Sequence, residues 1–474
     1  MNTALQDIIS TAPLTIVTVT ALAVLVIEAL ARQKELLTWW LSIGGLLFAF
    51  VAAASTVGET GHAFNGMVTT GGFADYFAMV FAAAGLTSIL LSRSYIRKVQ
   101  FESGEYYALV LFGVVGMILM ASAADLIIAF LGLEIMSISF YVLAGFARKR
   151  DASNEAALKY FLLGAFATGF LLYGIALVYG TVRSTEISAV VQAAPGLARS
   201  PLFMIGLAMI LVGLAFKVAA VPFHMWAPDV YEGSPTTVSA FMSTGGKAAA
   251  FAVMLLVFAP GVVHATPSLR EVLSVIAALS MIVGNVIAIS QVSVKRMLAY
   301  SSVAHAGYIL VGIVAANQTG NNGVLFYLMA YTMMNVGAFG VLSILESADG
   351  QNLTFDAYAG ISAKRPLLAG LMAVFMFSLA GVPPFAGFFG KYYVFVGAVE
   401  GGFTWLAILG VVMSVVSAYF YLRLVVVMYF KEQVSVIEEP VPVAGMVALV
   451  LSALVLVELG IFPSTVLNIT QHFF

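Results

Sequence analysis

Long apolar runs alternate with short polar or Gly/Pro-containing breaks along the whole chain. A helix that crosses a bilayer needs about 20 mostly apolar residues, and the runs predict fourteen such helices. Their approximate ranges are 12–31, 37–56, 73–92, 105–122, 125–146, 155–180, 201–228, 235–259, 268–290, 296–316, 321–345, 366–399, 403–430 and 441–463. The connections are too short for a soluble domain, so the predicted fold class is an all-α polytopic membrane protein. Within them, 186–197 is expected to be a short interfacial helix or a plain loop.

The composition agrees with a membrane protein. Hydrophobic residues make up 62% of the chain and charged residues only 9%, whereas soluble domains carry about 25% charged residues. The formal net charge of -2 leaves no basic surplus for a nucleic acid backbone, which excludes nucleic acid as a partner. The first run, 12–31, is too long for the core of a signal peptide and no cleavage pattern follows it, so it is expected to be the first membrane helix.

The chain is expected to carry no cofactor of its own. It contains no cysteine, which excludes disulfides, iron–sulfur clusters, thiolate-bound zinc and cysteine nucleophiles. The sequence also has no phosphate-binding loop, no His pair for a haem and no cluster of metal-binding carboxylates. Any electron transfer must therefore take place on another chain.

The basic residues predict an orientation, because Lys and Arg gather on the cytoplasmic side of a membrane protein. In the predicted topology one face holds only Arg183, Arg199 and Arg270. The other face holds fourteen basic residues, namely Arg32, Lys34, Arg93, Arg97, Lys98, Arg148, Lys149, Arg150, Lys295, Arg296, Lys364, Arg365, Arg423 and Lys431. This asymmetry predicts that both termini lie on the outer side.

Four lysines fall inside the predicted spans, namely Lys159, Lys217, Lys247 and Lys391, and Glu134 joins them. A charge at the centre of a membrane helix costs at least about 2.5–3.5 kcal/mol, so Glu134, Lys217 and Lys247, near the middle of their helices, are expected to face the interior, paired or hydrated. An amine in a low-dielectric site holds its proton less tightly than in water, and a nearby carboxylate reverses this. Such a lysine can load and release a proton when its partner moves. The alternative is a purely structural ion pair or a lysine that snorkels to the interface, and Lys159, near a helix end, fits either role.

Two predicted spans contain a break. The range 201–228 holds Pro222 a few residues after Lys217, and 366–399 holds Gly381, Pro383 and Pro384 two turns before Lys391. Proline cannot donate a helical hydrogen bond, and a discontinuous helix inside a membrane must face protein or water. Kinks used only for packing remain the alternative.

The two breaks indicate an internal repeat. The stretches 219–223 (AAVPF) and 380–385 (AGVPPF) are similar, with Pro383 lying 161 residues after Pro222, and 141–145 resembles 308–312 at an offset of 167. Helices four to eight then align with helices nine to thirteen, and because five is odd the two copies are inverted. The predicted organisation is 1–104 for the first three helices, 105–259 and 260–430 for the two repeats, and 431–474 for the last helix.

Two histidines are candidates for relaying protons between the lysines, because their ordinary pKa lies near neutral pH. His224 follows the first break and His305 lies within the tenth predicted helix. A neutral histidine that bonds a backbone carbonyl is the alternative for His305. The histidines in loops or in the tail are assigned no role.

These residues resemble the antiporter-like membrane subunits of respiratory complex I, the bacterial NADH:quinone oxidoreductase, over nearly the whole chain. The most specific stretches are 130–137 (FLGLEIMS), 216–236 (FKVAAVPFHMWAPDVYEGSPT), 247–249 (KAA), 295–302 (KRMLAYSS) and 381–385 (GVPPF) with Lys391. Within the family the chain is most similar to subunit N, since it lacks the long lateral helix of subunit L, while subunit M is a weaker contender. It departs from the family in having Thr237 and Gly246 where proline is usual.

The resemblance implies a proton-translocating subunit of the membrane arm, in the inner membrane, with two inverted repeats and broken helices seven and twelve. It implies that Glu134 pairs with Lys217 and that Lys247 and Lys391 continue a hydrated line, while Lys159 and His305 match further family positions. The expected partners are other membrane-arm subunits, the lipid bilayer and protons. The alternatives are a cation/proton antiporter or membrane-hydrogenase subunit of the same fold, and a structural coupler that conducts nothing.

Overall fold

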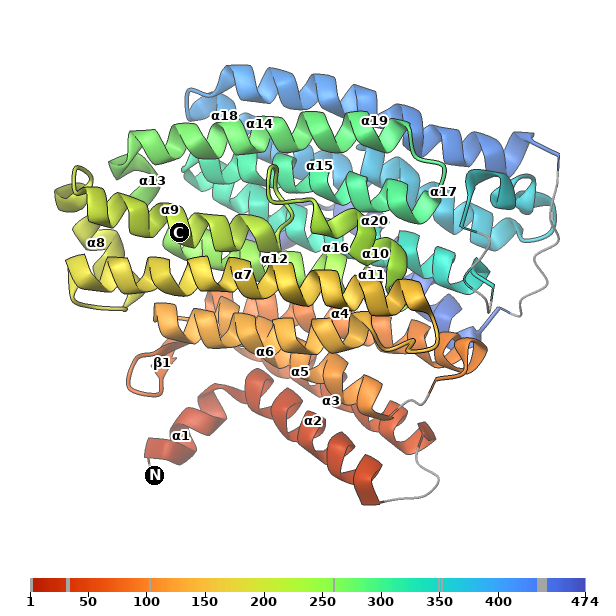
Figure 1. Ribbon diagram of the computed structural model, residues 1–474, viewed down its shortest axis with the longest axis horizontal. Coiled ribbons are helices and arrows are strands. Elements are labelled where there is room, and N and C mark those ends of the chain that lie inside the picture. The colour runs from red at the N-terminus through yellow and green to blue at the C-terminus, as the bar shows by residue number, and fades with distance from the viewer. Residues whose placement is uncertain are drawn as a thin grey trace.

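The computed structural model describes residues 3–30, 35–101, 104–258, 261–347, 350, 353–432 and 441–473. Figure 1 shows a bundle of helices packed side by side, with α2 and α3 at one edge and α18 and α19 at the opposite edge. Of the basic residues used to orient the helices, Arg32 and Lys34 lie outside the described residues.

Twelve helical segments in the described ranges are long and apolar enough to cross a membrane. They are α2 (Ala12–Leu30), α3 (Glu35–Thr56), α4 (Gly72–Val99), α5 (Gly104–Ala121), α6 (Leu126–Ala144), α7 (Asp151–Val182), the continuous segment Thr236–Val257, α14 (Pro267–Ile289), α15 (Val294–Ala315), α16 (Gln318–Leu345), α19 (Thr404–Phe430) and α20 (Val443–Ile461). The segment Thr236–Val257 consists of α11 (Thr236–Phe241), the π-helical turn η1 (Met242–Gly246) and α12 (Lys247–Val257). The chain is therefore an all-α, multi-pass membrane protein.

The two spans predicted to be broken are each built from two shorter helices. The first consists of α9 (Pro201–Lys217) and α10 (Trp226–Gly233), and the second of α17 (Pro366–Ala380) and α18 (Ala386–Glu400). Helix α17 ends because Gly381 adopts a left-handed conformation, with φ of 87°, and its N–H bonds back to Phe377 and Ser378. Pro383 and Pro384 follow and cannot restart a helical ladder at once. The total of fourteen membrane passes stays a prediction, because neither broken span is among the twelve long helices.

Short elements complete the structure. They are α1 (Thr3–Ser10), the antiparallel hairpin of β1 (Thr60–Ala63) and β2 (Val68–Gly71), α8 (Ile187–Leu197), α13 (Val262–Ala265), two 3-10 turns, η2 (Phe355–Tyr358) and η3 (Ile361–Ala363), and α21 (Ser464–Thr470). Helix α8 decides the open question about 186–197 in favour of a helix. The β-hairpin was not predicted.

The interior of the bundle is formed by α15, α16 and the segment Thr236–Val257, which are almost entirely buried, whereas α2, α7 and α19 keep one face exposed. Small residues allow close contacts between helices. A Cβ atom on Gly116 of α5 would lie only 2.5 Å from the carbonyl oxygen of Gly132 on α6. Residues on the inner helices are consequently shielded from lipid, and Lys247 and His305 lie on two of these helices.

Candidate functional site

Lys217 lies where the first broken helix stops. It is the last residue of α9, and its side chain is buried among α6 and α7. Its Nζ donates hydrogen bonds to Ser137 Oγ at 2.8 Å and to Tyr160 OH at 3.0 Å. The ring centroids of Phe140, Tyr141 and Tyr160 lie 5.7, 5.6 and 4.9 Å from the same nitrogen. The amine is therefore surrounded by hydroxyls and aromatic faces, which stabilise a cation without supplying a negative charge to pair with it.

Glu134 lies one helical turn before Ser137 on α6 and is only half-buried. Its Oε1 atom is buried and has no hydrogen-bond partner among the residues described. Within that part of the chain, the Glu134 carboxylate forms no ion pair with Lys217; the lysine bonds Ser137 instead. The carboxylate thus stands beside the amine at the edge of the bundle, and the direct pair implied by the resemblance is not formed in this arrangement.

Lys247 begins α12 directly after the π-helical turn η1. Its Nζ donates to the Ser302 carbonyl oxygen at 2.7 Å and to Ser302 Oγ at 2.8 Å, both on α15. Single π-helical turns inside α-helices often occur at functional positions, because they shift the register of the residues that follow. In the described structure no carboxylate lies within ion-pair distance of this amine, so its partner is a neutral serine.

His305 lies on α15 and is almost completely buried. Its Nδ1 lies 2.7 Å from Tyr327 OH on α16, and its Nε2 lies 3.0 Å from Tyr421 OH on α19. Tyr421 OH also shares a short hydrogen bond with Ser301 Oγ. Each hydroxyl can both donate and accept, so the imidazole takes part in a chain of exchangeable protons rather than the carbonyl bond considered as the alternative.

Lys391 lies on α18 after the second break. Its Nζ donates to the carbonyl oxygens of Leu379 and Ala380 at 3.2 and 2.9 Å, which are among the last carbonyls of α17. The end of a helix leaves such carbonyls without intrahelical partners and concentrates negative dipole there. The same nitrogen lies 4.8 Å from the ring centroid of Tyr308 on α15. The broken helix therefore supplies the site that holds this amine.

Together these contacts form a polar line through the second half of the bundle. Lys247 bonds Ser302, its neighbour Ser301 bonds Tyr421, Tyr421 bonds His305, and Tyr308 lies between His305 and Lys391. The exposed fractions of Lys217, Lys247 and Lys391 are 4, 2 and 5%. Three of the four predicted lysines are consequently buried inside the protein.

Sequence reasoning missed the hydroxyl groups of this line. Tyrosine and serine are common in membrane helices and gave no separate signal. A signal did exist on α15, where Ser301, His305 and Tyr308 recur at intervals of four and three residues and so share one helix face. The partner hydroxyls of Tyr160, Tyr327 and Tyr421 come from other helices and could not be assigned from spacing.

The remaining candidates lie apart from the line. Lys159 is partly exposed and forms ion pairs with Glu155 at 2.7 Å and Asp229 at 2.9 Å, in keeping with the structural role considered for it. His224 is half-buried in the break 218–225, and its buried Nδ1 has no hydrogen-bond partner among the described residues. Neither side chain makes a hydrogen bond to the lysines or tyrosines of the line within the described ranges.

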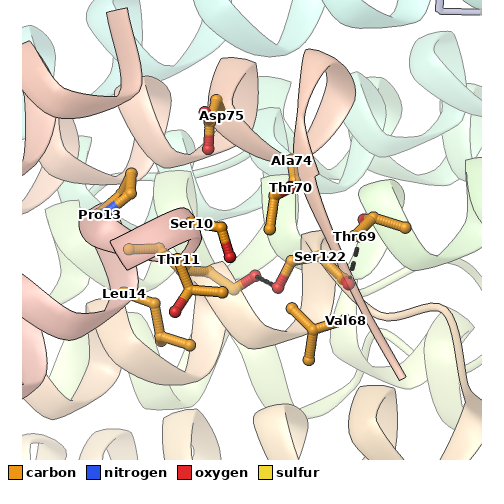
Figure 2. Close-up of a pocket in the computed structure, with 11 residues that line it drawn as sticks. Ser10, Thr11, Pro13, Leu14, Val68, Thr69, Thr70, Ala74, Asp75 and Ser122 are labelled. Carbon is orange, nitrogen blue, oxygen red and sulfur yellow. Dashed lines mark hydrogen bonds between the residues drawn. The ribbon is translucent and has the colours of Figure 1, made fainter. Parts of the chain in front are cut away.

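Lys391 also lines a hollow. This groove of about 810 Å³ between α17, α18 and α19 is otherwise lined mainly by apolar residues such as Val411 and Val415. Figure 2 shows a much smaller polar pocket of about 10 Å³ beside β2, where Thr69 Oγ1 donates to the Ser122 carbonyl at 3.1 Å and Asp75 lies nearby. No group of three or more His, Cys, Asp or Glu side chains placed to hold a metal occurs among the described residues.

Comparison with known proteins identifies the family. Residues 123–417 match the family model described as NADH:quinone oxidoreductase/Mrp antiporter, transmembrane. NADH-quinone oxidoreductase subunit N of Trichlorobacter lovleyi is 47% identical over 97% of this chain and 95% of its own length. Subunit N 1 of Chloroherpeton thalassium is 45% identical over 99% of this chain and 98% of its own.

Solved structures agree. A chain of respiratory complex I from Thermus thermophilus superposes with a TM-score of 0.84 at 38% identity, covering 97% of this chain and 99% of that one. A chain of the Mrp complex from a Dietzia species shares the fold alone, with a TM-score of 0.86 at 21% identity over 98% of this chain and 96% of that chain. The chain therefore belongs to the antiporter-like family of membrane subunits, and within it to the subunit N group of NADH-quinone oxidoreductases.

Proposed function

We propose that this chain translocates protons as a membrane-arm subunit of NADH:quinone oxidoreductase, with redox chemistry taking place on other subunits. The observation that carries the proposal is the set of three buried amines, Lys217, Lys247 and Lys391, whose hydrogen-bond partners among the described residues are all uncharged. Burying an amine is costly, and helices are held together more cheaply by small residues. Amines that are not fixed in ion pairs can gain and lose protons.

The geometry supports a mechanism in which Glu134 controls Lys217. A carboxylate that approaches the amine favours its protonated form, and withdrawal favours release. Quinone chemistry elsewhere in the complex would change this separation. A proton then passes to Lys247 and Ser302, continues through the neighbouring Ser301, Tyr421 and His305 towards Lys391, and leaves on the outer side. Hydroxyls and imidazole serve this transfer because each accepts one proton while donating another. Lys159 and His224, outside the line, are lower-ranked relay candidates.

We further propose that both termini face the outer, periplasmic side of the inner membrane, because the basic residues gather at the other face. The division into 1–104, two inverted repeats at 105–259 and 260–430, and 431–474 is supported by the equivalent breaks after Lys217 and before Lys391. The partners are other membrane-arm subunits, lipid and protons. We propose no cofactor on this chain.

Two rival functions share parts of this support. A cation/proton antiporter or membrane-hydrogenase subunit would use the same fold, but relatives named subunit N at 42–47% identity favour the oxidoreductase. A structural coupler that conducts nothing would need the charges only to transmit movement. If pumping stoichiometry persists after Lys247 and Lys391 are neutralised together, the coupler is the better description.

The test uses Lys247→Gln in the assembled complex. Glutamine can still donate a hydrogen bond to Ser302 but has no proton to release. The expected result is normal assembly with fewer protons pumped per NADH oxidised, because the transfer step through this chain slows about a hundredfold or more when its proton-carrying group is removed. Lys149→Gln, at an exposed lysine, is the matched control and should pump normally. Pumping at the wild-type ratio in Lys247→Gln would refute the proposal.

A further inference from the structure

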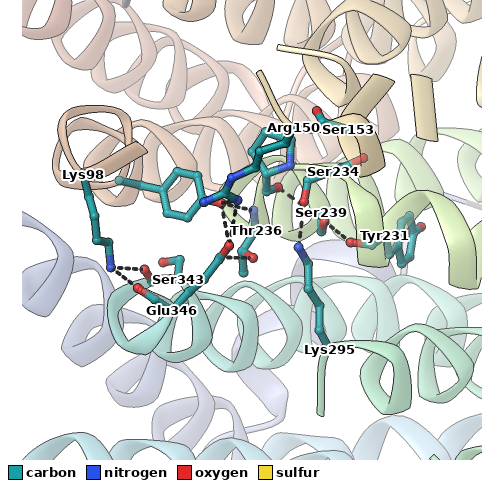
Figure 3. A network of polar contacts seen from close by, with 12 residues as sticks. Lys98, Arg150, Ser153, Tyr231, Ser234, Thr236, Ser239, Lys295, Ser343 and Glu346 are labelled. Carbon is teal, nitrogen blue, oxygen red and sulfur yellow. Dashed lines mark hydrogen bonds and ion pairs between the residues drawn. The ribbon is translucent and has the colours of Figure 1, made fainter. Parts of the chain in front are cut away.

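A polar cluster at the basic end of the bundle is not part of the line described above (Figure 3). Glu346 follows α16, and its carboxylate accepts hydrogen bonds from Arg150 Nη1 and Tyr95 OH, each at 3.0 Å, and from Thr236 Oγ1. Nearby, Lys98 Nζ donates to the carbonyls at the end of α16. We call Tyr95, Arg150, Thr236 and Glu346 the Glu346 cluster. It fixes the start of α11, the helix that continues to Lys247.

A fourth buried lysine lies beside this cluster. Lys295 on α15 and Glu346 each expose only 1% of their surface. Lys295 Nζ donates to the Ser234 carbonyl at 2.6 Å, and the charges near it are Glu346 and Glu232, which attract it, and Arg150, which repels it. The Glu232 carboxylate in turn accepts from Ser293 at 3.1 Å. The amine therefore has a neutral direct partner, like Lys217, Lys247 and Lys391.

Two hydroxyls near Lys295 and Lys247 have no hydrogen-bond partner among the described residues. Ser234 Oγ and Tyr231 OH are buried, and neither makes a hydrogen bond with any described residue. The Tyr231 hydroxyl lies beside Ser302 without meeting the geometry of a direct hydrogen bond, and Ser302 is the residue that binds Lys247. Buried polar groups without protein partners are ordinarily satisfied by water. These hydroxyls thus mark a hydrated route.

The spacing on α15 supports the same route. Lys295 and Ser302 are seven residues apart, so they lie on one face of the helix, separated by about 10.5 Å along its axis. That distance is too long for direct transfer but suits two hydroxyls bridged by water, since water-mediated hydrogen bonds are nearly as favourable as direct ones. Helix α10, which carries Tyr231 and leads into Ser234, packs directly against α15.

We propose that Lys295 is a further proton-carrying residue, which takes up a proton at the basic, cytoplasmic end and passes it to Lys247 through water held by Ser234 and Tyr231. The inference rests on the proposed function. One proton binds the neutral Lys295 amine, one then leaves it for the hydroxyl and water chain, and one arrives at the neutral Lys247 amine; no bond between heavy atoms changes. Glu346 is a positioning residue. Its negative charge favours the protonated form of Lys295, and its hydrogen bond from Thr236 holds the start of α11 in place.

The competing explanation is that Lys295 only caps α10, because Ser234 is the C-cap residue of that helix. Tyr231→Phe separates the two. This variant removes a hydroxyl that bonds no described residue, so a structural role predicts an unchanged complex. Tyr107→Phe is the matched control, because Tyr107 OH is likewise buried and unpartnered among the described residues but lies on α5, away from α10 and α15.

Both variants, together with Lys295→Gln, are placed in the intact complex in inside-out membrane vesicles, where acidification per NADH oxidised is recorded with a pH-sensitive dye. We expect Tyr231→Phe to pump severalfold more slowly, with a steeper loss as the pH on the basic side rises, and Tyr107→Phe to match wild type. If Lys295→Gln assembles, its pumping falls about tenfold. Wild-type pumping in Tyr231→Phe overturns the route. Lys247→Gln is measured in parallel. If Lys247→Gln pumps poorly while Tyr231→Phe pumps normally, only the route through Lys295 is wrong; if both pump normally, the proposed function is wrong as well.

Discussion

Replacing Glu346 is expected to lower the stability of the protein strongly, although the Glu346 cluster is not part of the polar line between Lys247 and Lys391. Replacing Glu346 by alanine removes the carboxylate that accepts from Arg150, Tyr95 and Thr236. Breaking a buried ion pair by removing one partner costs about 3–5 kcal/mol, because the other charge stays buried and unpaired. Arg150 keeps 21% of its side chain exposed, so water recovers part of this loss. We therefore expect a value near the lower end, about 3 kcal/mol.

A loss of about 3 kcal/mol changes the folded-to-unfolded ratio more than a hundredfold. With a urea dependence of about 3 kcal/mol per molar, the unfolding midpoint falls by about 1 M. The assay is denaturant titration in detergent micelles followed by tryptophan fluorescence, to which Trp226 on α10, near the cluster, contributes.

The matched control is Glu35→Ala. Glu35 pairs with Arg97 at 2.9 Å and with Arg93 at 3.6 Å, but the carboxylate is 33% exposed and the arginines are 59 and 27% exposed. Such exposed pairs contribute at most about 1 kcal/mol each. Glu346→Gln, which keeps the shape and one acceptor, should fall between the two. If Glu346→Ala and Glu35→Ala unfold at the same urea concentration, the buried carboxylate does not hold the two halves of the bundle together and the reasoning is wrong.

Three further predictions follow from single contacts. Gly246→Ala places a Cβ 2.5 Å from Phe140 Cε2, so it should lower stability by about 1–3 kcal/mol in the same titration, with recovery on adding Phe140→Leu. Tyr421→Phe breaks the link from Ser301 to His305. It should slow pumping and lower the free energy of unfolding by about 1–3 kcal/mol, because two buried hydrogen bonds are lost with one hydroxyl; unchanged pumping would remove Tyr421 from the line. Arg270→Met frees the carbonyls of Val314, Ala315 and Gly401, so it should lower stability by about 1–3 kcal/mol while leaving protons pumped per NADH unchanged in assembled complexes.

The sequence predicts the helices because a bilayer imposes a length and an apolar composition on each. Their ends are less certain. Helix α7 runs from Asp151 to Val182 rather than over 155–180, since its first turn contains polar residues that an apolar run leaves out. The hairpin at 60–71 was missed although Asn65-Gly66, a strong turn signal, lies at its tip with both residues at positive φ. A prediction based only on apolar runs does not detect a short polar hairpin between two of them.

The lysines of the site could be predicted from the sequence, but their hydroxyl partners could not. A charge in an apolar run is conspicuous, whereas a tyrosine or serine is ordinary there. Tyr327 and Tyr421 reach His305 from helices that are distant in sequence, so only packing brings them together. Glu346 and Lys295 lie at helix ends, where charges are common, and their burial could not be read from composition.

The structure also explains why the buried amines differ from the Glu346 cluster. In that cluster a carboxylate and a guanidinium are paired at 3.0 Å, which fixes both charges and suits a permanent joint. Lys217, Lys247 and Lys391 have only hydroxyl and carbonyl partners among the described residues. For an amine in such a site, proton affinity depends on whichever charge comes near. Because Glu134 stands one turn from Ser137 and is not bonded to Lys217, a modest shift of α6 against α9 changes the charge that Lys217 experiences. Neutral partners thus leave the proton affinity of Lys217 open to change, whereas a permanent ion pair would fix it.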